Sequence, residues 1–367
     1  MKTRRFLGWV AMATMLVGTG CSSDEVVNDY SPENAIQFGT YIGKNAEARG
    51  TALDNVVATG LPKQGFGVFA YYTDNEDFDA ETSPLNFMNN THVTSTDGNA
   101  WTYSPIKYWP NEATDKLSFF AYAPYAKTYQ APTAGNPILD FIVDKDVTNH
   151  IDLVVANDKH INLTKQAISE NVKFTFAHVL SKVGFKVEAV IDEKNHQQDG
   201  EKPDADNENK DYYDDATTVS VQEVELIGAF YNSGKINLNT SLWSEKVKAA
   251  ETKYLLSSED FDEVANKVTI KPTQLNKSSE YMMLIPTETM SIKIRVKYTV
   301  TTEDTALSDG KSVVVNNITS NDISFTFDQG KAYNFVLHLG LTSVKLSAIV
   351  SDWAEQDVVV NVPMNEP

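Results

Sequence analysis

The single cysteine, Cys21, is the residue with the most definite chemistry in this chain. It directly follows Gly18-Thr19-Gly20, small residues of the kind that a signal peptidase accepts, although Gly18 stands where most bacterial lipoproteins carry leucine. A lone cysteine cannot close a disulfide within its own chain. In an exported protein its thiol therefore indicates an acylation site, for example for palmitate. The alternative is an incidental cysteine beside an ordinary signal peptide.

The residues before Cys21 have the organisation of an export signal. Lys2, Arg4 and Arg5 form a basic start, and an apolar stretch follows at residues 6–17. This stretch is shorter than the roughly 20 apolar residues that a membrane span needs, and no later stretch of the sequence approaches that length. We therefore predict a lipoprotein signal peptide at residues 1–20, with acyl chains on Cys21 holding the protein at a membrane.

A second site of chemistry is the peptide bond between Arg49 and Gly50, within Ala48-Arg49-Gly50-Thr51. A trypsin-like protease cuts after arginine where the chain is accessible, and this stretch follows a strand-like run at residues 35–42. In that run Ile36, Phe38 and Ile42 fit the period-two pattern of a half-buried strand. Residues 21–50 therefore read as a tether with a removable leader strand.

No pattern in the sequence predicts catalysis. Ser-His-Asp, zinc-ligand and phosphate-loop patterns were not found, and the histidines are scattered without metal-ligand spacing at positions His92, His150, His160, His178, His196 and His338. We predict no catalytic residue, no metal and no cofactor, and interpret His178 as a core or turn residue.

One acidic insert, residues 197–215, carries oxygen ligands at alternate positions, as a calcium loop does: Asp204, Asp206 and Glu208. However, Asn209 stands at the place of the expected glycine, and Asp215 at the place of the expected glutamate. A solvated surface loop is the favoured interpretation, and a calcium site stays the alternative.

Composition sets the broad class of the protein. The chain has 367 residues, of which 41% are hydrophobic and 22% charged, so it is predicted to be globular and long enough for two domains. Its formal net charge of −19 argues against a nucleic-acid partner, which requires a basic face.

Short apolar runs separated by turn signals continue along the whole chain and predict an all-β fold of β-sandwiches with few short helices. We place a boundary near Asn171, between an N-terminal domain at residues 51–170 and a C-terminal domain at residues 171–367. The clearest alternation lies at Ile292, Ile294, Val296 and Tyr298. Trp101, Tyr103, Tyr108 and Trp109 are aromatic residues that either belong to the core or form a sugar-binding platform.

Several motifs occur together in a fixed order. They are the cysteine followed by the acidic run Asp24-Glu25, Ala48-Arg49-Gly50, Tyr108-Trp109-Pro110 before Phe119-Phe120-Ala121-Tyr122, Phe176-Ala177-His178, and Gly330-Lys331-Ala332-Tyr333 before Asp352-Trp353. In this order and spacing the chain resembles the fimbrillin family of Bacteroidales, the Mfa-like and FimA-like type V pilins. The resemblance spans essentially the whole chain.

The resemblance implies two transthyretin-like β-sandwich domains and a lipoprotein precursor anchored in the outer membrane before it enters a cell-surface fimbrium. It also implies cleavage by an arginine-specific protease after Arg49, and then exchange of strands with other pilin subunits. The displaced strand corresponds to Ile36, Phe38 and Ile42. The donor segment corresponds to residues 355–367, with Val358, Val360 and Val362 as its apolar positions.

A different class of function stays open at this point. The chain could be a monomeric surface lipoprotein that keeps its leader and binds glycans or host ligands through its aromatic strands. The two hypotheses differ in the fate of the leader, which must leave in a fimbrial subunit and must stay in a monomeric binding protein.

Overall fold

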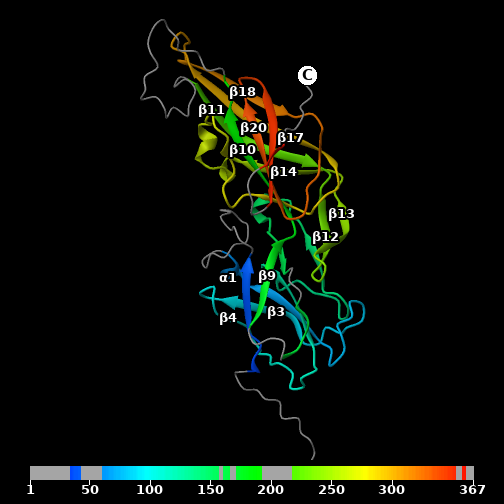
Figure 1. Cartoon of the computed structure of the whole chain (residues 1–367). Coiled ribbons are helices and arrows are strands. Elements are labelled where there is room, and N and C mark those ends of the chain that lie inside the picture. The colour runs from blue at the N-terminus through cyan, green and yellow to red at the C-terminus, as the bar shows by residue number, and fades with distance from the viewer. Residues whose placement is uncertain are drawn as a thin grey trace, which may run out of the picture.

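The computed structural model describes residues 34–42, 60–156, 160–165, 171–191, 217–352 and 358–360. In these ranges the chain is almost entirely β-strand, so the all-β prediction is confirmed (Figure 1). The helical elements are the single turn α1 (Leu61–Gln64) and the short 3-10 helices η2 (Val147–Asn149), η4 (Ser258–Asp260) and η5 (Glu263–Asn266). None of the helices described is long and apolar enough to cross a membrane.

The first sheet is mixed and has the strand order β1-β9-β7-β5-β2-β3-β4, with β8 paired to β5. Its strands are β1 (Phe38–Ile42), β2 (Phe66–Tyr72), β3 (Met88–Ser95), β4 (Trp101–Thr102), β5 (Leu117–Ala123), β7 (Val154–Ala156), β8 (His160–Leu163) and β9 (Val172–His178). The central strands β2 and β5 are buried along almost their whole length, as expected for strands that are covered on both faces.

Two further sheets form a sandwich in the C-terminal half (Figure 1). One sheet has the order β15-β10-β20-β21-β22, with β16 paired to β10, and the other has the order β14-β11-β17-β18, with β19 paired to β17. Their strands are β10 (Ser181–Ala189), β11 (Thr217–Gly228), β14 (Thr252–Ser257), β15 (Thr273–Gln274), β16 (Met282–Leu284), β17 (Met290–Glu303), β18 (Lys311–Thr319), β19 (Ile323–Phe325), β20 (Lys331–Leu339), β21 (Val344–Asp352) and β22 (Val358–Val360). The alternating residues predicted to face one side, Ile292 to Tyr298, are all buried in β17.

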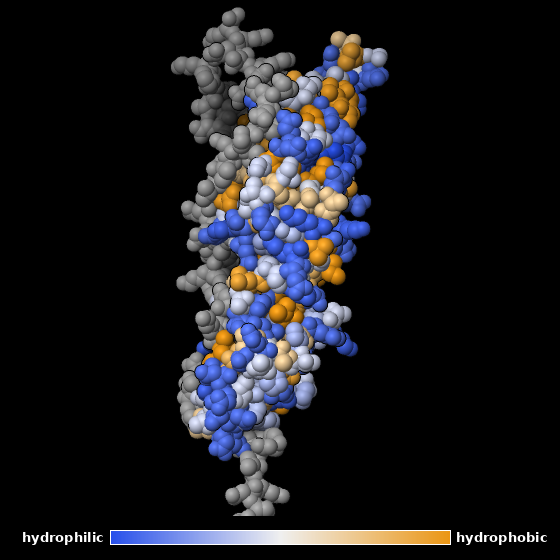
Figure 2. All heavy atoms as spheres, turned by 90° about the vertical axis from the view of Figure 1, so that its right-hand side faces the viewer, coloured by the Kyte–Doolittle hydropathy of each residue, from blue (hydrophilic) through white to orange (hydrophobic). Residues whose placement is uncertain are grey.

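A small sheet joins the two halves of the chain. Strand β6 (Ile138–Ile142) pairs with β12 (Tyr231–Asn237), and β12 pairs with β13 (Leu242–Lys248). Ile142, Leu242 and Val247 are exposed on these strands. Figure 2 shows the side on which β12 and β13 lie in Figure 1, and its hydrophobic residues form separate patches in a largely hydrophilic surface. Scattered apolar residues of this kind are normal on a solvent-exposed protein surface.

The hydrophobic core has two parts. One cluster, which contains Val68 and Phe119, covers one face of the first sheet. The adjacent residues Phe69 and Phe120 point to the opposite face and belong to a larger cluster that continues into the C-terminal sandwich. The first sheet is therefore buried on both faces, and its position relative to the C-terminal sheets is fixed by shared packing.

The point at which the chain leaves the first sheet differs from the boundary placed near Asn171. Strand β9 follows Asn171 but pairs with β1 and β7 in the first sheet, and the next strand, β10, begins the C-terminal sheets. The change of sheet therefore lies at Val179 and Leu180. Both strands are apolar and only a short turn separates them, so composition does not mark this position.

Candidate functional site: the leader strand and its groove

Strand β1, which contains the predicted leader strand and is called the leader below, lies at the edge of the first sheet, parallel to β9 (Figure 1). The pairing register runs from Phe38 opposite Val172 to Ile42 opposite Phe176. Just before this ladder, the Val172 amide donates a hydrogen bond to the Gln37 carbonyl at 2.9 Å. In Figure 1 this parallel pair is seen as the blue arrow of β1 beside the green arrow of β9.

The residues that precede β1 are held by a second part of the chain. The Ile36 amide donates to the Lys107 carbonyl at 2.9 Å, and the Trp109 amide donates to the Asn34 carbonyl at 2.9 Å. In addition, the Tyr103 hydroxyl donates to the Ile36 carbonyl at 2.8 Å. The leader is thus hydrogen-bonded both to β9 and to residues 103–109.

The side chain of Phe38 fills an aromatic pocket. Its ring centroid lies 5.2 to 6.2 Å from those of four other aromatic residues, Phe66, Tyr103, Phe119 and Phe174. Phe38 is only 1% exposed, and Ile36 is 2% exposed. Burial of each of these side chains contributes about 1.5–3 kcal/mol, and well-placed aromatic pairs add about 0.5–1.5 kcal/mol each.

Burial also fixes the protonation state of the hydroxyl that holds the leader. It raises the pKa of Tyr103 to about 12, while a backbone hydrogen bond from Lys107 partly opposes the shift. The hydroxyl therefore stays protonated near neutral pH and remains a donor to the Ile36 carbonyl.

The structure places some of the predicted site residues and not others. Ile36 and Phe38 are in the core, as the apolar face of the leader requires. Ile42 ends β1, and Val358 and Val360 lie in β22, but the side chains of these three residues are outside the described part of the structure. Cys21, Arg49, Gly50 and Val362 lie outside the described residues altogether, so their roles stay predictions.

The segment predicted to act as a donor is far from the leader in the fold. Strand β22 pairs antiparallel with β21 at the edge of a C-terminal sheet, with Val358 opposite Val350 and Val360 opposite Ala348. The leader and this segment therefore occupy edges of different sheets.

Sequence reasoning missed the residues that form the groove. Tyr103 and Phe174 contact Phe38, and β9 supplies the whole pairing edge. Val172, Phe174 and Phe176 are buried and alternate along β9. Such alternation carries no information about the strand that lies beside it.

The aromatic residues considered as a sugar platform belong largely to this groove. Tyr103 and Trp109 are buried, and Trp101 packs on Phe66 with ring centroids 5.0 Å apart. They line the core around the leader, so they do not form one exposed aromatic surface.

The histidines in the described ranges have structural partners. His178 Nδ1 lies 3.0 Å from Asp152, and His150 bridges the Asp144 carbonyl and the Met283 amide. Within the described residues no group of histidine, cysteine and acidic side chains is arranged to hold a metal ion. The acidic insert 197–215 and His196 lie outside those residues.

One row of side chains has the order of a catalytic triad. His338 Nε2 lies 2.9 Å from Ser347 Oγ, and His338 Nδ1 contacts Glu188. The three residues lie on the neighbouring strands β10, β20 and β21 of one sheet, and Glu188 stands directly opposite His338. We interpret the row as hydrogen bonding across the face of a sheet.

Comparison with known proteins agrees with this architecture. Residues 55–353 match the fimbrillin-like family. A fimbrial protein from Bacteroides vulgatus is similar in structure, with a TM-score of 0.63 and 20% identity over 87% of this chain and 99% of that one. A candidate cell adhesion protein from Bacteroides uniformis has a TM-score of 0.47 and 16% identity, over 87% of this chain and 98% of that one. A search of curated protein sequences found no match. Because the family match covers most of the sequence, the chain belongs to the fimbrillin-like family.

Proposed function

We propose that this protein is a structural subunit of a cell-surface fimbria, assembled by proteolysis after Arg49 and exchange of the leader strand. The observation that carries the proposal is the leader itself, an edge strand whose residues Ile36 and Phe38 are core residues. Strand β1 lies near the N-terminus, so a single cleavage after it would separate it from the rest of the chain. Membership of the fimbrillin-like family, and likeness to a fimbrial protein, support adhesion as the wider role.

Loss of the leader would create the driving force for assembly. The rings of Phe66, Phe119 and Phe174 would lose their contact with Phe38, and β9 would lose its pairing partner. Exposed apolar surface and unpaired strand edges both cost free energy until another strand covers them. A strand from a neighbouring subunit would satisfy both.

The geometry of such an exchange determines the product. The groove beside β9 and the donor positions Val358, Val360 and Val362 belong to different regions of one chain. A contact between two different surfaces of identical subunits is heterologous, and it extends into a filament when it does not close into a ring. The added strand would pair with β9 through main-chain hydrogen bonds, as in other cases of strand addition.

The proposal includes delivery to the cell surface. Acylation of Cys21 would anchor the precursor in the outer membrane, and cleavage after Arg49 would release the remainder from that anchor. Lipidation, the arginine-specific protease and the order of these steps are parts of the proposal. Labelling of the precursor with a fatty acid, compared with a Cys21→Ser variant, tests the anchor directly.

The small number of arginines makes the cleavage test specific for one peptide bond. The sequence contains four arginines, of which Arg4 and Arg5 belong to the predicted signal peptide. Arg295 lies in the middle of β17 and is held by Glu225 at 2.7 Å and Glu223 at 3.1 Å. Because β17 is paired on both sides, a folded chain protects this bond. An arginine-specific protease is therefore expected to cut the folded precursor once, after Arg49.

The decisive experiment is limited digestion of the folded precursor, followed by N-terminal sequencing and an unboiled denaturing gel. The expected result is a new N-terminus at Gly50 and a ladder of stable multimers. Arg49→Lys keeps the charge but removes the protease site, so this variant should stay intact and monomeric. Polymer from Arg49→Lys would refute the trigger. Absence of cleavage after Arg49 would favour the monomeric surface lipoprotein.

A further inference from the structure

Strand β18 is an open edge of the C-terminal sandwich. The strand order of its sheet ends at β18, and in the described part of the chain no strand pairs with it on the side away from β17. Three consecutive valines at its centre are exposed to solvent: Val313 is 50%, Val314 is 37% and Val315 is 62% exposed. An edge strand with exposed apolar residues is able to pair with a further strand.

The hydrogen bonds at the two ends of β18 show which backbone groups face the open side. The Ser320 amide donates to the Ile294 carbonyl at 2.8 Å, and the Asp304 amide donates to the Gly310 carbonyl at 2.9 Å. Hydrogen-bonded pairs alternate along an antiparallel ladder, so the even-numbered residues of β18 bond to β17. The odd-numbered residues therefore direct their N–H and C=O groups away from β17, to the open edge.

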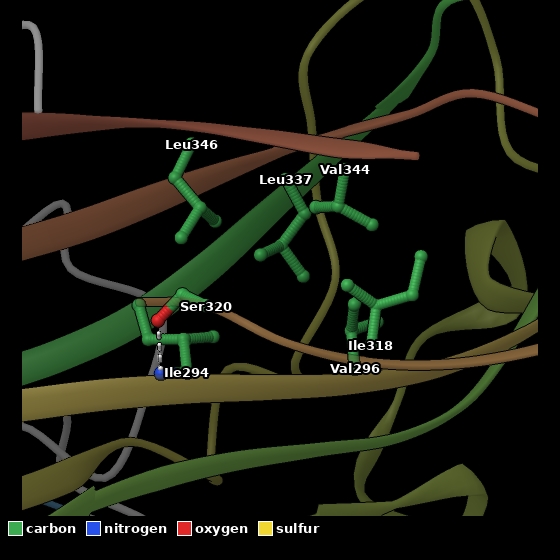
Figure 3. A pocket seen from close by; sticks show the side chains of 7 residues that line it. All are labelled: Ile294, Val296, Ile318, Ser320, Leu337, Val344 and Leu346. Carbon is green, nitrogen blue, oxygen red and sulfur yellow. Dashed lines mark hydrogen bonds between the residues drawn. The ribbon is translucent and has the colours of Figure 1, made fainter. Parts of the chain in front are cut away.

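The inner face of β18 is occupied by the sandwich itself. Figure 3 shows Ile318 pointing, together with side chains of β17, toward Leu337 of β20 and Leu346 of β21. Asn316, on the same face, is 8% exposed, and its side-chain amide donates to the Leu341 carbonyl at 3.0 Å. These contacts hold the strand in place, so its open edge already has the extended conformation that pairing requires.

A second edge strand of the molecule, β13, has the protection that β18 lacks. The ladder between β13 and β12 is interrupted by two register shifts, Glu245 has a positive φ of 46°, and Lys246 and Lys248 carry charges. Bulges and charged residues are usual devices against edge-to-edge pairing. In β18 the ladder is uninterrupted, and the one charged residue is Lys311 at its start. This contrast indicates that the β18 edge is an interaction surface.

The sequence of β18 is complementary to an antiparallel copy of itself. When two copies pair about a two-fold axis at Val314, Val313 of one copy lies opposite Val315 of the other, and Val314 lies opposite its own equivalent. Each valine then meets a valine, and β-branched pairs of this kind stabilise a sheet. Lys311 lies opposite Asn317, so the two lysines are roughly 20 Å apart along the ladder. Parallel pairing in register would place them side by side.

We propose that two copies of this chain associate through their β18 edges, antiparallel and about a two-fold axis at Val314. Odd-numbered residues of one copy then face odd-numbered residues of the other, so their free N–H and C=O groups form hydrogen-bonded pairs. The contact is isologous, whereas exchange of the leader gives a heterologous contact. It links subunits, or the fimbriae that they build, side by side, and it does not depend on the proposed proteolysis.

Sedimentation of the uncleaved Cys21→Ser chain over a series of concentrations tests the contact. The expected result is an equilibrium between monomer and dimer. Val315→Lys should raise the Kd of the dimer about ten-fold or more, because it places a charge opposite Val313 of the other copy. Val315→Pro should do the same, because it removes an N–H group from the open edge while the ladder to β17 stays complete.

Val247→Lys is the matched control for these variants. Val247 is similarly exposed, at 54%, but lies in the protected edge strand β13, so this change should leave the Kd within about two-fold. Far-UV circular dichroism checks that each variant is folded.

Disulfide formation tests the register. In the same Cys21→Ser background, which contains no other cysteine, Val314→Cys lies opposite its equivalent and should give a disulfide-linked dimer on a non-reducing gel. Val313→Cys and Val315→Cys are each two residues out of register with their equivalents and should link more slowly. Equal or faster linkage at either position would contradict pairing about Val314.

A chain that stays monomeric at every concentration would overturn the proposal, and so would a dimer that Val315→Lys leaves intact. Association at this edge with a different protein only would mean that a foreign strand is the occupant, and that result would overturn it as well. Because these tests use uncleaved protein, a failure of cleavage after Arg49 does not affect them.

Discussion

Phe38 in the leader strand stacks on Phe174 in β9, with ring centroids 5.7 Å apart and ring planes inclined by 22°. The two residues belong to the segment that is proposed to leave and to the strand that stays behind. Their contact is therefore part of the packing that holds the leader in the uncleaved precursor. Removal of the ring of Phe38 should weaken that hold while the groove residues stay intact.

Phe38→Ala is expected to lower the free energy of unfolding of the uncleaved precursor by about 3–5 kcal/mol, the usual range for a buried phenylalanine. The reason is that Phe38 is only 1% exposed and that the variant loses its contacts with four surrounding rings. Urea denaturation followed by tryptophan fluorescence measures the change. Gln37→Ala, at the exposed neighbouring position, is the control and should change the free energy by less than about 0.5 kcal/mol. A loss below about 1 kcal/mol for Phe38→Ala would show that this ring does not anchor the leader.

Tyr103→Phe is expected to loosen the leader without a change in the shape of the core. It removes the hydroxyl that donates to the Ile36 carbonyl at 2.8 Å, a bond that contributes about 1 kcal/mol. Local opening should then be about five-fold more frequent. Hydrogen exchange of a peptide that covers residues 34–42 measures this change.

Tyr298→Phe is the matched control for that experiment. It removes a similar bond, from the Tyr298 hydroxyl to the Gly340 carbonyl at 2.7 Å, but in the C-terminal sandwich. Exchange of the leader should be unchanged in this variant. An equal increase in both variants would mean that the effect is global and that Tyr103 has no particular role in holding the leader.

Sequence reasoning succeeded where one face of a strand is buried. The alternation of Ile292, Ile294, Val296 and Tyr298 predicted the buried side of β17, and the spacing of Ile36 and Phe38 predicted the buried side of the leader. These patterns follow from the period of two along a strand. They are local, so a single sequence is enough to detect them.

It failed where the information is not local. Nothing in the period of two indicates that β1 pairs with β9 or that β6 pairs with β12, because pairing joins segments far apart in the chain. Strands β13 and β18 lack such a pattern for another reason. Their residues are mostly exposed, so they have no buried face and no alternation of apolar and polar residues.

Gly184→Ala is expected to destabilise the protein by about 1–3 kcal/mol through overpacking. A methyl group at this position in β10 would lie 2.5 Å from Tyr281 Cε1 and 2.8 Å from Asn334 Oδ1, so both side chains would have to move. Thermal or urea denaturation measures the loss. Gly39→Ala, where the added methyl meets only the flexible side chain of Lys173 at 3.2 Å, should cost less than about 1 kcal/mol. A Gly184→Ala variant as stable as this control would contradict the close packing of Tyr281 on β10.

A buried lysine lies close to the point where the chain passes from the first sheet to the C-terminal sandwich. Lys182, at the start of β10, is 6% exposed, and its Nζ lies 3.9 Å from the centre of the Tyr281 ring. The charged groups near it include Asp152, which is also buried and lies 3.0 Å from His178 Nδ1. Burial lowers the pKa of Lys182 from 10.5 to about 8, and the negative charge of Asp152 partly opposes this shift.

Stability should therefore rise with pH in a defined window. Between pH 8 and pH 10.5 the unfolded chain binds a proton at Lys182 that the folded chain has lost, so the free energy of unfolding increases with pH. From pH 7.5 to pH 10 the gain is on the order of 2–3 kcal/mol relative to Lys182→Met, which cannot titrate at this position. Burial raises the pKa of Tyr281 to about 12, so its hydroxyl stays neutral throughout. Urea denaturation of both proteins at several pH values measures the difference. The other titrating groups are common to both proteins, so parallel curves would mean that Lys182 keeps an ordinary pKa in the folded protein.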